Sequence, residues 1–116
     1  MNRLLISVIV TGLSCGSAWA ELRNLTGEEI AALLPAIVAS GKKTRQTFSV
    51  AGATTYTDRG RDTYGSWRVQ GDKYCSQWPP ADGWACYGVA YDAETATLVW
   101  IDGGGDRTIN TVRPKN

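Results

Sequence analysis

The sequence contains no histidine, one phenylalanine and one methionine among its 116 residues. Histidine is the commonest general base at neutral pH and the commonest metal ligand in proteins, so its absence excludes Ser/His/Asp and Cys/His catalysis within one chain. A phosphate-binding loop is also missing, because Gly103-Gly104-Gly105 is followed by neither a helix nor a lysine. We therefore expect no enzyme activity, no bound metal and no cofactor.

Long apolar runs are missing apart from residues 4–10. Arg3 places a positive charge before this run, and residues 18–20 (Ala-Trp-Ala) have the small-x-small pattern of a cleavage site. These features predict a signal peptide over residues 1–20, cleaved after Ala20, and a periplasmic or secreted mature chain. A bilayer span needs about 20 apolar residues, so we expect no membrane span in the mature chain.

The chain also lacks an excess of charge of either sign. It has 12 basic and 11 acidic side chains, and Arg3 leaves with the signal peptide, so residues 21–116 carry no formal net charge. Such a balance gives no electrostatic footprint for nucleic acid or for an anionic membrane. We expect one small monomeric domain over residues 21–116, whose partner is an unknown protein or envelope ligand.

Only three cysteines occur, and Cys15 lies in the predicted signal peptide. Lipid attachment at Cys15 and an uncleaved N-terminal anchor remain alternatives to cleavage. The other two cysteines form an even number, as expected in an oxidising compartment. If a hairpin loop is centred after Pro80, Cys75 lies opposite Cys86. The Cβ atoms of directly opposed residues are about 4.5–5.5 Å apart, and a disulfide needs a Cβ separation of about 3.5–4.5 Å, so such a pair is a plausible but demanding place for one. We therefore predict a hairpin closed by a Cys75–Cys86 disulfide.

A helix is predicted near the start of the mature chain. Thr26 and Glu29 have the spacing of a capping box. Pro35 predicts that the regular helix ends or kinks just before it, and Gly41 closes the segment. An amphipathic helix that binds a partner or a membrane is the alternative to packing across a sheet. The apolar residues at helical spacing predict one buried face: Ile30, Leu33, Leu34 and Ile37.

From Lys42 onward the pattern changes to short alternating segments separated by glycine- and aspartate-containing turns. Because no helix lies between them, these segments indicate an antiparallel meander, and the need to protect its edges favours closure. The predicted fold class is α+β: an N-terminal amphipathic helix packed on a six- to seven-stranded, barrel-like antiparallel meander. The expected strands include residues 47–50, 54–57, 66–70, both arms of the cysteine hairpin, 95–101 and 107–112.

Two carboxylate pairs are the remaining candidates for chemistry. Asp102 and Asp106 bracket three glycines, where a loop can wrap Ca²⁺, but calcium takes about 6–8 oxygen ligands. The preferred interpretation there is a hairpin turn with a polar residue on each side of the glycines. Asp58 and Asp62 flank another turn and leave a carboxylate-based hydrolase open.

Aromatic residues around the cysteine hairpin are the best candidates for a binding site, because they bury much area at low entropic cost. The alternative is that the indoles near the hairpin tip fold back onto the sheet and shield the disulfide. The candidate binding residues are Gln77, Trp78, Trp84, Tyr74 and Arg68. The remaining aromatic and apolar residues of the region are predicted in the core or at its rim: Trp67, Trp100, Tyr87, Val89 and Tyr91.

Residues 65–89, GSWRVQGDKYCSQWPPADGWACYGV, complete a recognisable pattern. Together with the LTGEEI helix start, they resemble small exported proteobacterial proteins of unknown function, which couple an LTxEEI-type helix to a GxWxVxGDxYC hairpin and a second cysteine. The resemblance covers Leu25 to about Ile101. It implies an exported, periplasmic bacterial protein with Cys75 and Cys86 paired, and it implies no activity.

The favoured hypothesis is a non-enzymatic periplasmic module that binds a protein, a peptide or an envelope component. One alternative is an inhibitor of a secreted hydrolase, with the hairpin tip plugging an active site. The other alternative is an enzyme that uses paired carboxylates.

Overall fold

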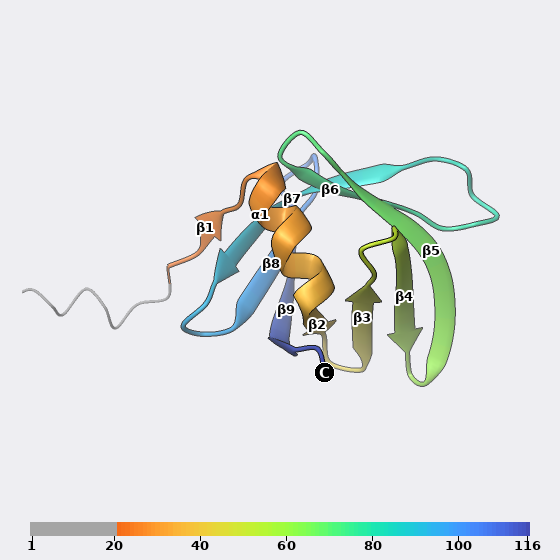
Figure 1. Ribbon diagram of the computed structural model, residues 1–116, viewed down its shortest axis with the longest axis horizontal. Helices are drawn as coiled ribbons and strands as arrows, with labels where there is room; N and C mark the ends of the chain where they lie inside the picture. Colours follow the sequence, from red (N-terminus) through yellow and green to blue (C-terminus); the bar gives the residue numbers. More distant parts are fainter. Residues whose placement is uncertain (1–20) are drawn as a thin grey trace, which may run out of the picture.

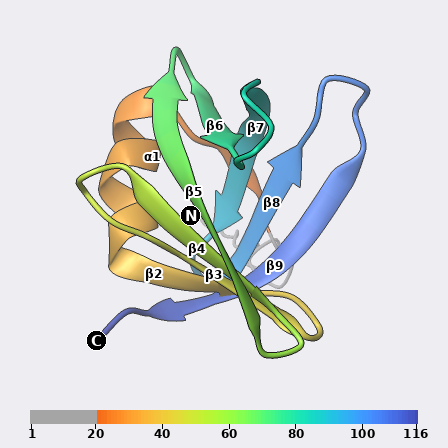
Figure 2. The ribbon, with the colours of Figure 1, turned by 90° about the vertical axis from the view of Figure 1, so that its right-hand side faces the viewer.

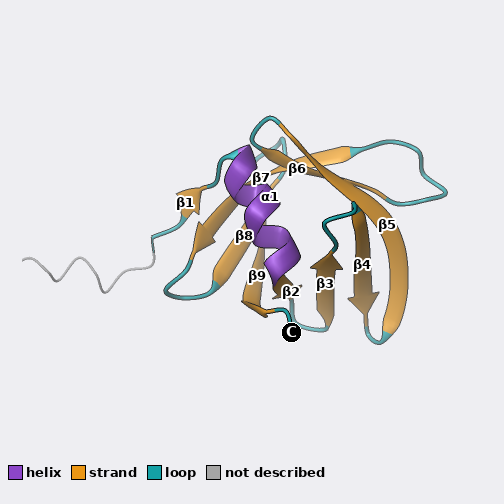
Figure 3. Ribbon diagram, viewed as in Figure 1, coloured by secondary structure: helices purple, strands orange, loops and turns teal. Residues whose placement is uncertain are grey.

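Strands make up most of residues 21–116, which are the residues that the computed structural model describes (Figures 1 and 3). The predicted signal peptide and Cys15 lie outside the described residues. No helix within residues 21–116 is long and apolar enough to cross a membrane. The elements are β1 (Arg23–Asn24), α1 (Gly27–Leu33), a 3₁₀ turn (Leu34–Ala36), β2 (Ile37–Ser40), β3 (Thr44–Phe48), β4 (Ala53–Asp58), β5 (Arg61–Gln70), β6 (Lys73–Gln77), β7 (Ala85–Asp92), β8 (Thr97–Ile101) and β9 (Arg107–Pro114).

The strands form a closed antiparallel barrel. Each strand from β2 to β8 pairs with the next one along the chain, and β9 returns to pair with β2. The short β1 adds beside β7, with Arg23 opposite Tyr91. Closure leaves the eight barrel strands without an unpaired edge. The predicted barrel-like meander is thus confirmed, and the predicted helix is present.

Two parts of the fold prediction need correction. The barrel has eight strands rather than six or seven, and within residues 21–116 the fold is mostly β, with a single helical segment of 10 residues instead of a balanced α+β arrangement. The missed strand is β2, whose first three residues are all buried. Such a strand shows no apolar–polar alternation, so Ile37 extended the helical pattern by chance. Gly41 lies in the turn after β2 and does not close the helix.

Helix α1 begins at the predicted capping box. The Glu29 backbone N–H donates to Thr26 Oγ1 at 3.3 Å, and the Thr26 N–H donates to Glu29 Oε1 at 2.9 Å. A further cap comes from the turn between β5 and β6, where Asp72 Oδ1 accepts from the Gly27 N–H at 2.7 Å. The α-helix ends at Leu33, directly before the 3₁₀ turn that contains Pro35, as the proline predicts.

Replacement of Thr26 by alanine is expected to lower the free energy of unfolding by about 1 kcal/mol, because the Glu29 N–H loses its acceptor. Urea unfolding of the two proteins measures the difference. Thr55→Ala is a control on a strand, away from any helix end. A Thr26→Ala protein as stable as the wild type would contradict the assigned cap.

The helix covers one end of the barrel. Figure 1 shows α1 in front of β8, β9 and β2, and it contacts β5 and β6. Leu25, Ile30 and Leu34 are buried beneath it in the core. Gly27 allows this close approach, because a Cβ atom there would collide with the carbonyl oxygen of Gly71. This end of the barrel is therefore filled.

Phe48 is the centre of the barrel interior. Its ring lies edge-on to those of Trp67, Tyr74 and Trp100, with centroids 5.6, 5.7 and 6.1 Å away. Edge-to-face aromatic pairs add to the free energy of area burial. The core predictions are confirmed: Trp67, Trp100 and Val89 are buried, and Tyr87 and Tyr91 are partly buried against the core.

The cysteine hairpin has the predicted register. Cys75 lies opposite Cys86 with their Cα atoms 4.0 Å apart, the two form a disulfide, and Tyr74 lies opposite Tyr87. The ladder ends at the Ser76–Ala85 pair. Counting outward from the same centre would also place Gln77 opposite Trp84, and this pair does not form. Residues 78–84 make a loop instead, with a cis peptide bond between its two prolines.

Asp92 fixes the start of the described chain to the barrel. Its buried carboxylate accepts hydrogen bonds from the backbone N–H groups of Glu21 and Glu94, both at 3.1 Å, and from the Thr95 hydroxyl at 2.9 Å. Burial raises the pKa of Asp92, but these hydrogen bonds together outweigh burial and leave the pKa below its ordinary value. Asp92 therefore stabilises the fold in its ionised form.

The lowered pKa of Asp92 predicts a pH-dependent contribution to stability. A carboxylate with a lowered folded-state pKa stabilises the fold above its unfolded pKa of about 3.9, and this stabilisation is lost as the pH falls through the folded value. Asp92→Asn should thus melt below the wild type at neutral pH, and the difference should shrink in acid. Melting curves recorded from neutral pH down to acid measure the difference in melting temperature. Asp82→Asn in the exposed loop is the control. A difference independent of pH would contradict the role given to the charge.

Candidate functional site: the open end of the barrel

The end of the barrel opposite α1 is open. Figure 2 faces this end: the β2–β3 and β4–β5 turns lie close together below the β6–β7 loop, and the β8–β9 hairpin turn lies apart from them at the upper right. The β5–β6 turn lies at the end that α1 covers, where Asp72 caps the helix. Small closed barrels of eight strands can hold one small ligand in such a mouth.

A cavity of about 470 Å³ occupies this open end. Its size lies within the range of about 300–1,000 Å³ typical of small-molecule sites. The lining residues come from all eight barrel strands and the turns beside them: Ala39, Gly41, Thr44, Gln46, Tyr56, Thr63, Tyr74, Ser76, Trp78, Tyr87, Trp100, Thr108, Ile109 and Asn110. Among the described residues, no aspartate, glutamate, lysine, arginine or cysteine belongs to this lining.

Two sets of aromatic rings line the cavity. The Tyr74 ring stacks on Trp100 with centroids 4.5 Å apart and an angle of 29° between the planes. On the neighbouring strand Tyr87 stacks on Tyr74 at 6.0 Å. Trp78 and Tyr56 meet edge-on at 6.2 Å, and both are only partly buried. These two rings thus combine an apolar surface with access from the mouth.

Gly65 makes room for Trp78. A Cβ atom at Gly65 would lie 2.6 Å from Cε3 of the Trp78 indole and 2.5 Å from the Gln77 carbonyl oxygen, closer than real Cβ contacts come. The indole therefore lies directly over the backbone of β5, and its Nε1–H donates to Ser76 Oγ at 3.1 Å. Both contacts hold Trp78 toward the interior.

Replacement of Gly65 by alanine is expected to cost about 1–3 kcal/mol of stability, because the backbone carbonyl of Gln77 cannot move away as a side chain would. The Trp78 indole should also shift, which changes its fluorescence. Chemical unfolding and emission spectra measure both effects. Gly83→Ala is the matched control, since a Cβ there meets nothing within 4 Å. Equal stability of the two variants would contradict the packing of Trp78.

Gln46 supplies a fixed polar group to the cavity. Its Nε2 donates to the phenol oxygen of Tyr74 at 2.9 Å and to Thr54 Oγ1 at 3.0 Å. The Thr54 hydroxyl donates its own hydrogen to the Thr47 carbonyl at 2.8 Å, so it can only accept from the amide nitrogen. This fixes the orientation of the Gln46 amide. Its Oε1 accepts no hydrogen bond from the described residues, although the side chain is only 7% exposed.

Tyr74 remains a hydrogen-bond donor in this setting. Burial raises the pKa of its phenol, and hydrogen bonds with Ser76 and Gln46 offset this only in part. The phenol therefore keeps its hydrogen at neutral pH while its oxygen accepts from Gln46.

Asn110 adds a second amide from β9. Its Nδ2 donates to the Leu98 carbonyl at 3.3 Å, and its Oδ1 accepts nothing from residues 21–116. Its side chain is also buried, with 9% exposure. A buried acceptor without a partner costs about 1–3 kcal/mol. Two such carbonyl oxygens in the lining of one cavity are what a ligand with N–H or O–H groups would satisfy.

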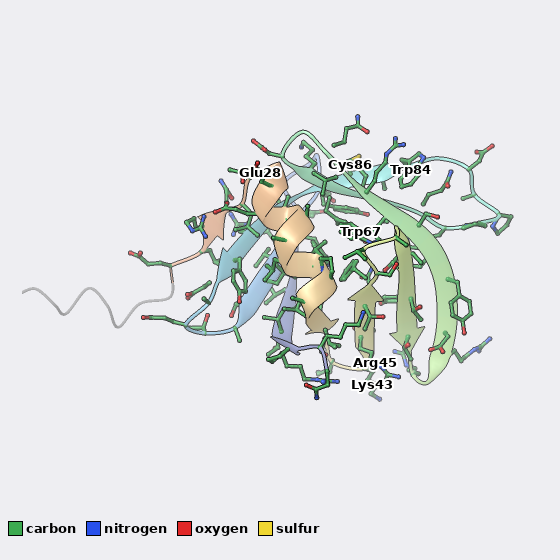
Figure 4. All side chains as sticks on the ribbon, viewed as in Figure 1. Glu28, Lys43, Arg45, Trp67, Trp84 and Cys86 are labelled. Atoms are coloured by element: carbon green, nitrogen blue, oxygen red, sulfur yellow. A yellow bond between two sulfur atoms is a disulfide. The ribbon has the colours of Figure 1, made fainter. Side chains whose placement is uncertain are left out.

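The five residues predicted to bind a ligand lie in three places. Tyr74 and Trp78 line the cavity. Arg68 and Trp84 lie together outside it, with the guanidinium carbon 4.0 Å from the centroid of the indole. Figure 4 shows Trp84 and Cys86 on the same side of the molecule. Gln77 holds the loop, because its Nε2 donates to the Asp82 carbonyl at 2.7 Å.

Each carboxylate pair flanks a hairpin turn, with Asp58 at the end of β4 and Asp62 in β5. Asp102 Oδ1 accepts from the backbone N–H groups of Gly104 and Asp106, both at 2.9 Å, as in the polar hairpin turn that was preferred over a calcium site. Asp62 accepts from Thr57 at 2.6 Å. Within residues 21–116, no group of three or more aspartate, glutamate or cysteine side chains is placed to hold a metal ion.

The sequence prediction missed most of the cavity. Gln46 and Asn110 are its two side-chain amides, and the buried Ser76 and the partly buried Tyr56 add hydroxyl groups to the lining. A signal was present: in Thr44-x-Gln46-x-Phe48 and Thr108-x-Asn110-x-Val112, polar residues occupy the inward positions toward one end of each strand. Such a change from apolar to polar along one face marks the end of a barrel that is not filled.

No family model matches the chain, and no curated protein or solved structure shows significant similarity to it.

Proposed function

We propose that residues 21–116 form a non-enzymatic binding module that holds a small molecule in the open end of the barrel. The observation that carries this proposal is the cavity of about 470 Å³, whose wall is aromatic and whose buried Gln46 and Asn110 carbonyl oxygens have no partner among the described residues. Apolar pockets with a few convergent polar groups are typical ligand sites.

Binding rather than catalysis is supported by the kind of groups in the cavity. Among the described residues its lining offers amides, hydroxyls and indoles, but no carboxylate, thiol or amine. The paired-carboxylate enzyme has less support, because Asp102 organises a turn and Asp58 forms an exposed ion pair with Arg59 at 3.0 Å.

We place the module in the periplasm or outside the cell. The Cys75–Cys86 disulfide supports this location, because disulfides persist in oxidising compartments. The resemblance to exported proteobacterial proteins and the signal peptide predicted over residues 1–20 point to the same place.

A second candidate is protein recognition by the β6–β7 loop, including the inhibition of a secreted hydrolase. The stacked Arg68 and Trp84 favour it, since both residue types are common at interface hot spots, and residues 79–83 beside them are exposed. The two candidates use tryptophans on different sides of the barrel wall.

A screen of small molecules by saturation-transfer NMR separates these candidates. We expect hits that the wild type and Trp84→Ala share and that Trp78→Ala loses. The matched pair removes one indole from the cavity and one from the outer face. Hits that disappear only in Trp84→Ala would assign binding to the loop, and a complete lack of hits would overturn the cavity as a site.

A further inference from the structure

The chemistry of the cavity specifies its ligand further. We infer that the ligand is an uncharged saccharide, with a sugar ring against the aromatic wall and its hydroxyl groups on the Gln46 and Asn110 amides. This inference rests on the proposed function, because it names the ligand of the same cavity.

Because the lining has no charged side chains, it excludes a ligand that carries a charged group inside the cavity. Among the described residues, all 14 that line the cavity are neutral, and the pKa of Tyr74 is raised. A carboxylate, phosphate or ammonium brought into this cavity would lose its hydration without gaining an opposite charge. The buried part of the ligand is therefore neutral.

The polar groups of the cavity match hydroxyls. Nine lining residues carry a hydroxyl or a side-chain amide: Thr44, Gln46, Tyr56, Thr63, Tyr74, Ser76, Tyr87, Thr108 and Asn110. The Gln46 and Asn110 carbonyl oxygens need donors, whereas the Tyr74 phenol offers a hydrogen. A hydroxyl both donates and accepts, so adjacent ligand hydroxyls can satisfy both kinds of group. A fatty acyl chain would leave these polar groups unpaired.

The aromatic rings of the cavity suit the side of a sugar ring that carries C–H groups. The face of an aromatic ring is its negative side, so it attracts the weakly positive C–H hydrogens along one side of a pyranose ring. The partly buried Trp78 and Tyr56 present such rings near the mouth. A flat heteroaromatic ligand would use the same rings, but it carries fewer edge groups for the nine polar side chains.

Calorimetric titration tests the inference on the purified protein. The probes are glucose, N-acetylglucosamine and their β-1,4-linked disaccharides, with glucuronate and glucosamine as charged analogues and thymine as a neutral heterocycle. We expect at least one neutral saccharide to bind, and its charged analogue to bind about tenfold or more weakly. No binding by any neutral saccharide, or equal binding of a charged analogue, would overturn the inference, as would binding of thymine alone.

Substitutions of lining residues test whether the saccharide binds in this cavity. Gln46→Leu and Asn110→Leu should each weaken saccharide binding about tenfold, since each removes one acceptor. Trp84→Ala should leave it unchanged, and circular dichroism shows whether each variant is folded. If Gln46→Leu does not fold, Asn110→Leu decides alone, and unaltered affinity there contradicts the inference. A non-saccharide hit that Trp78→Ala loses would overturn the ligand class and leave the cavity as a binding site.

Discussion

Replacing Phe48 with alanine is expected to lower the free energy of unfolding by about 3–5 kcal/mol. Phe48 is 1% exposed, and its ring lies edge-on to three other aromatic rings from β5, β6 and β8. The barrel strands are hydrogen-bonded around a closed circle, so they cannot collapse into the space that the ring leaves. The loss therefore includes both the transfer free energy and the cavity that remains.

Guanidinium unfolding followed by circular dichroism measures this loss. Val50→Ala is the matched control, because Val50 is two residues away and 88% exposed, and its change should stay within about 0.5 kcal/mol. A Phe48→Ala protein that loses less than about 1 kcal/mol would mean that the barrel interior is not organised around this ring.

Removal of the disulfide is the second large effect. The double variant Cys75→Ala/Cys86→Ala is expected to be less stable by about 3 kcal/mol, because the unfolded chain is no longer cross-linked over the sequence separation of 11 residues. For a domain of this size the melting temperature should fall by about 10–20 °C. The double variant leaves no cysteine within residues 21–116, so this part of the chain cannot form another disulfide.

Reduction is the control for this variant. A reducing agent should bring the wild type to the melting temperature of the double variant, and it should leave the double variant itself unchanged. An oxidised wild type that melts together with the double variant would show that the link between β6 and β7 contributes nothing to stability.

Local signals predicted the fold best. The capping box of Thr26 and Glu29 lies within four residues, and the register of Cys75 with Cys86 follows from counting outward from one turn. The strand β2 was missed because a buried strand has no alternation, and its pairing with β9 joins residues more than 70 positions apart. Closure of the barrel therefore depends on contacts that no short window of sequence contains.

The cavity depends on the directions in which its side chains point, and these can be derived from the sequence only once the strand register is known. Trp78 and Trp84 flank one loop and looked equivalent, yet Trp78 points inward over Gly65 and Trp84 stacks on Arg68 outside. Gln46 and Asn110 come from β3 and β9, which are separated by β2 and are distant in the sequence. Their convergence on one cavity follows only from the closed sheet.

The indole N–H signals of a ¹⁵N-labelled protein test the binding cavity most directly. Trp78 and Trp100 line the cavity, Trp67 is in the core and Trp84 is on the outer face, so the four indoles report from different places. During titration with the tightest neutral saccharide of the panel, we expect the Trp78 and Trp100 signals to move and the Trp84 signal to stay. Movement of Trp84 alone, with Trp78 and Trp100 unchanged, would show that the open end of the barrel is not where this protein binds.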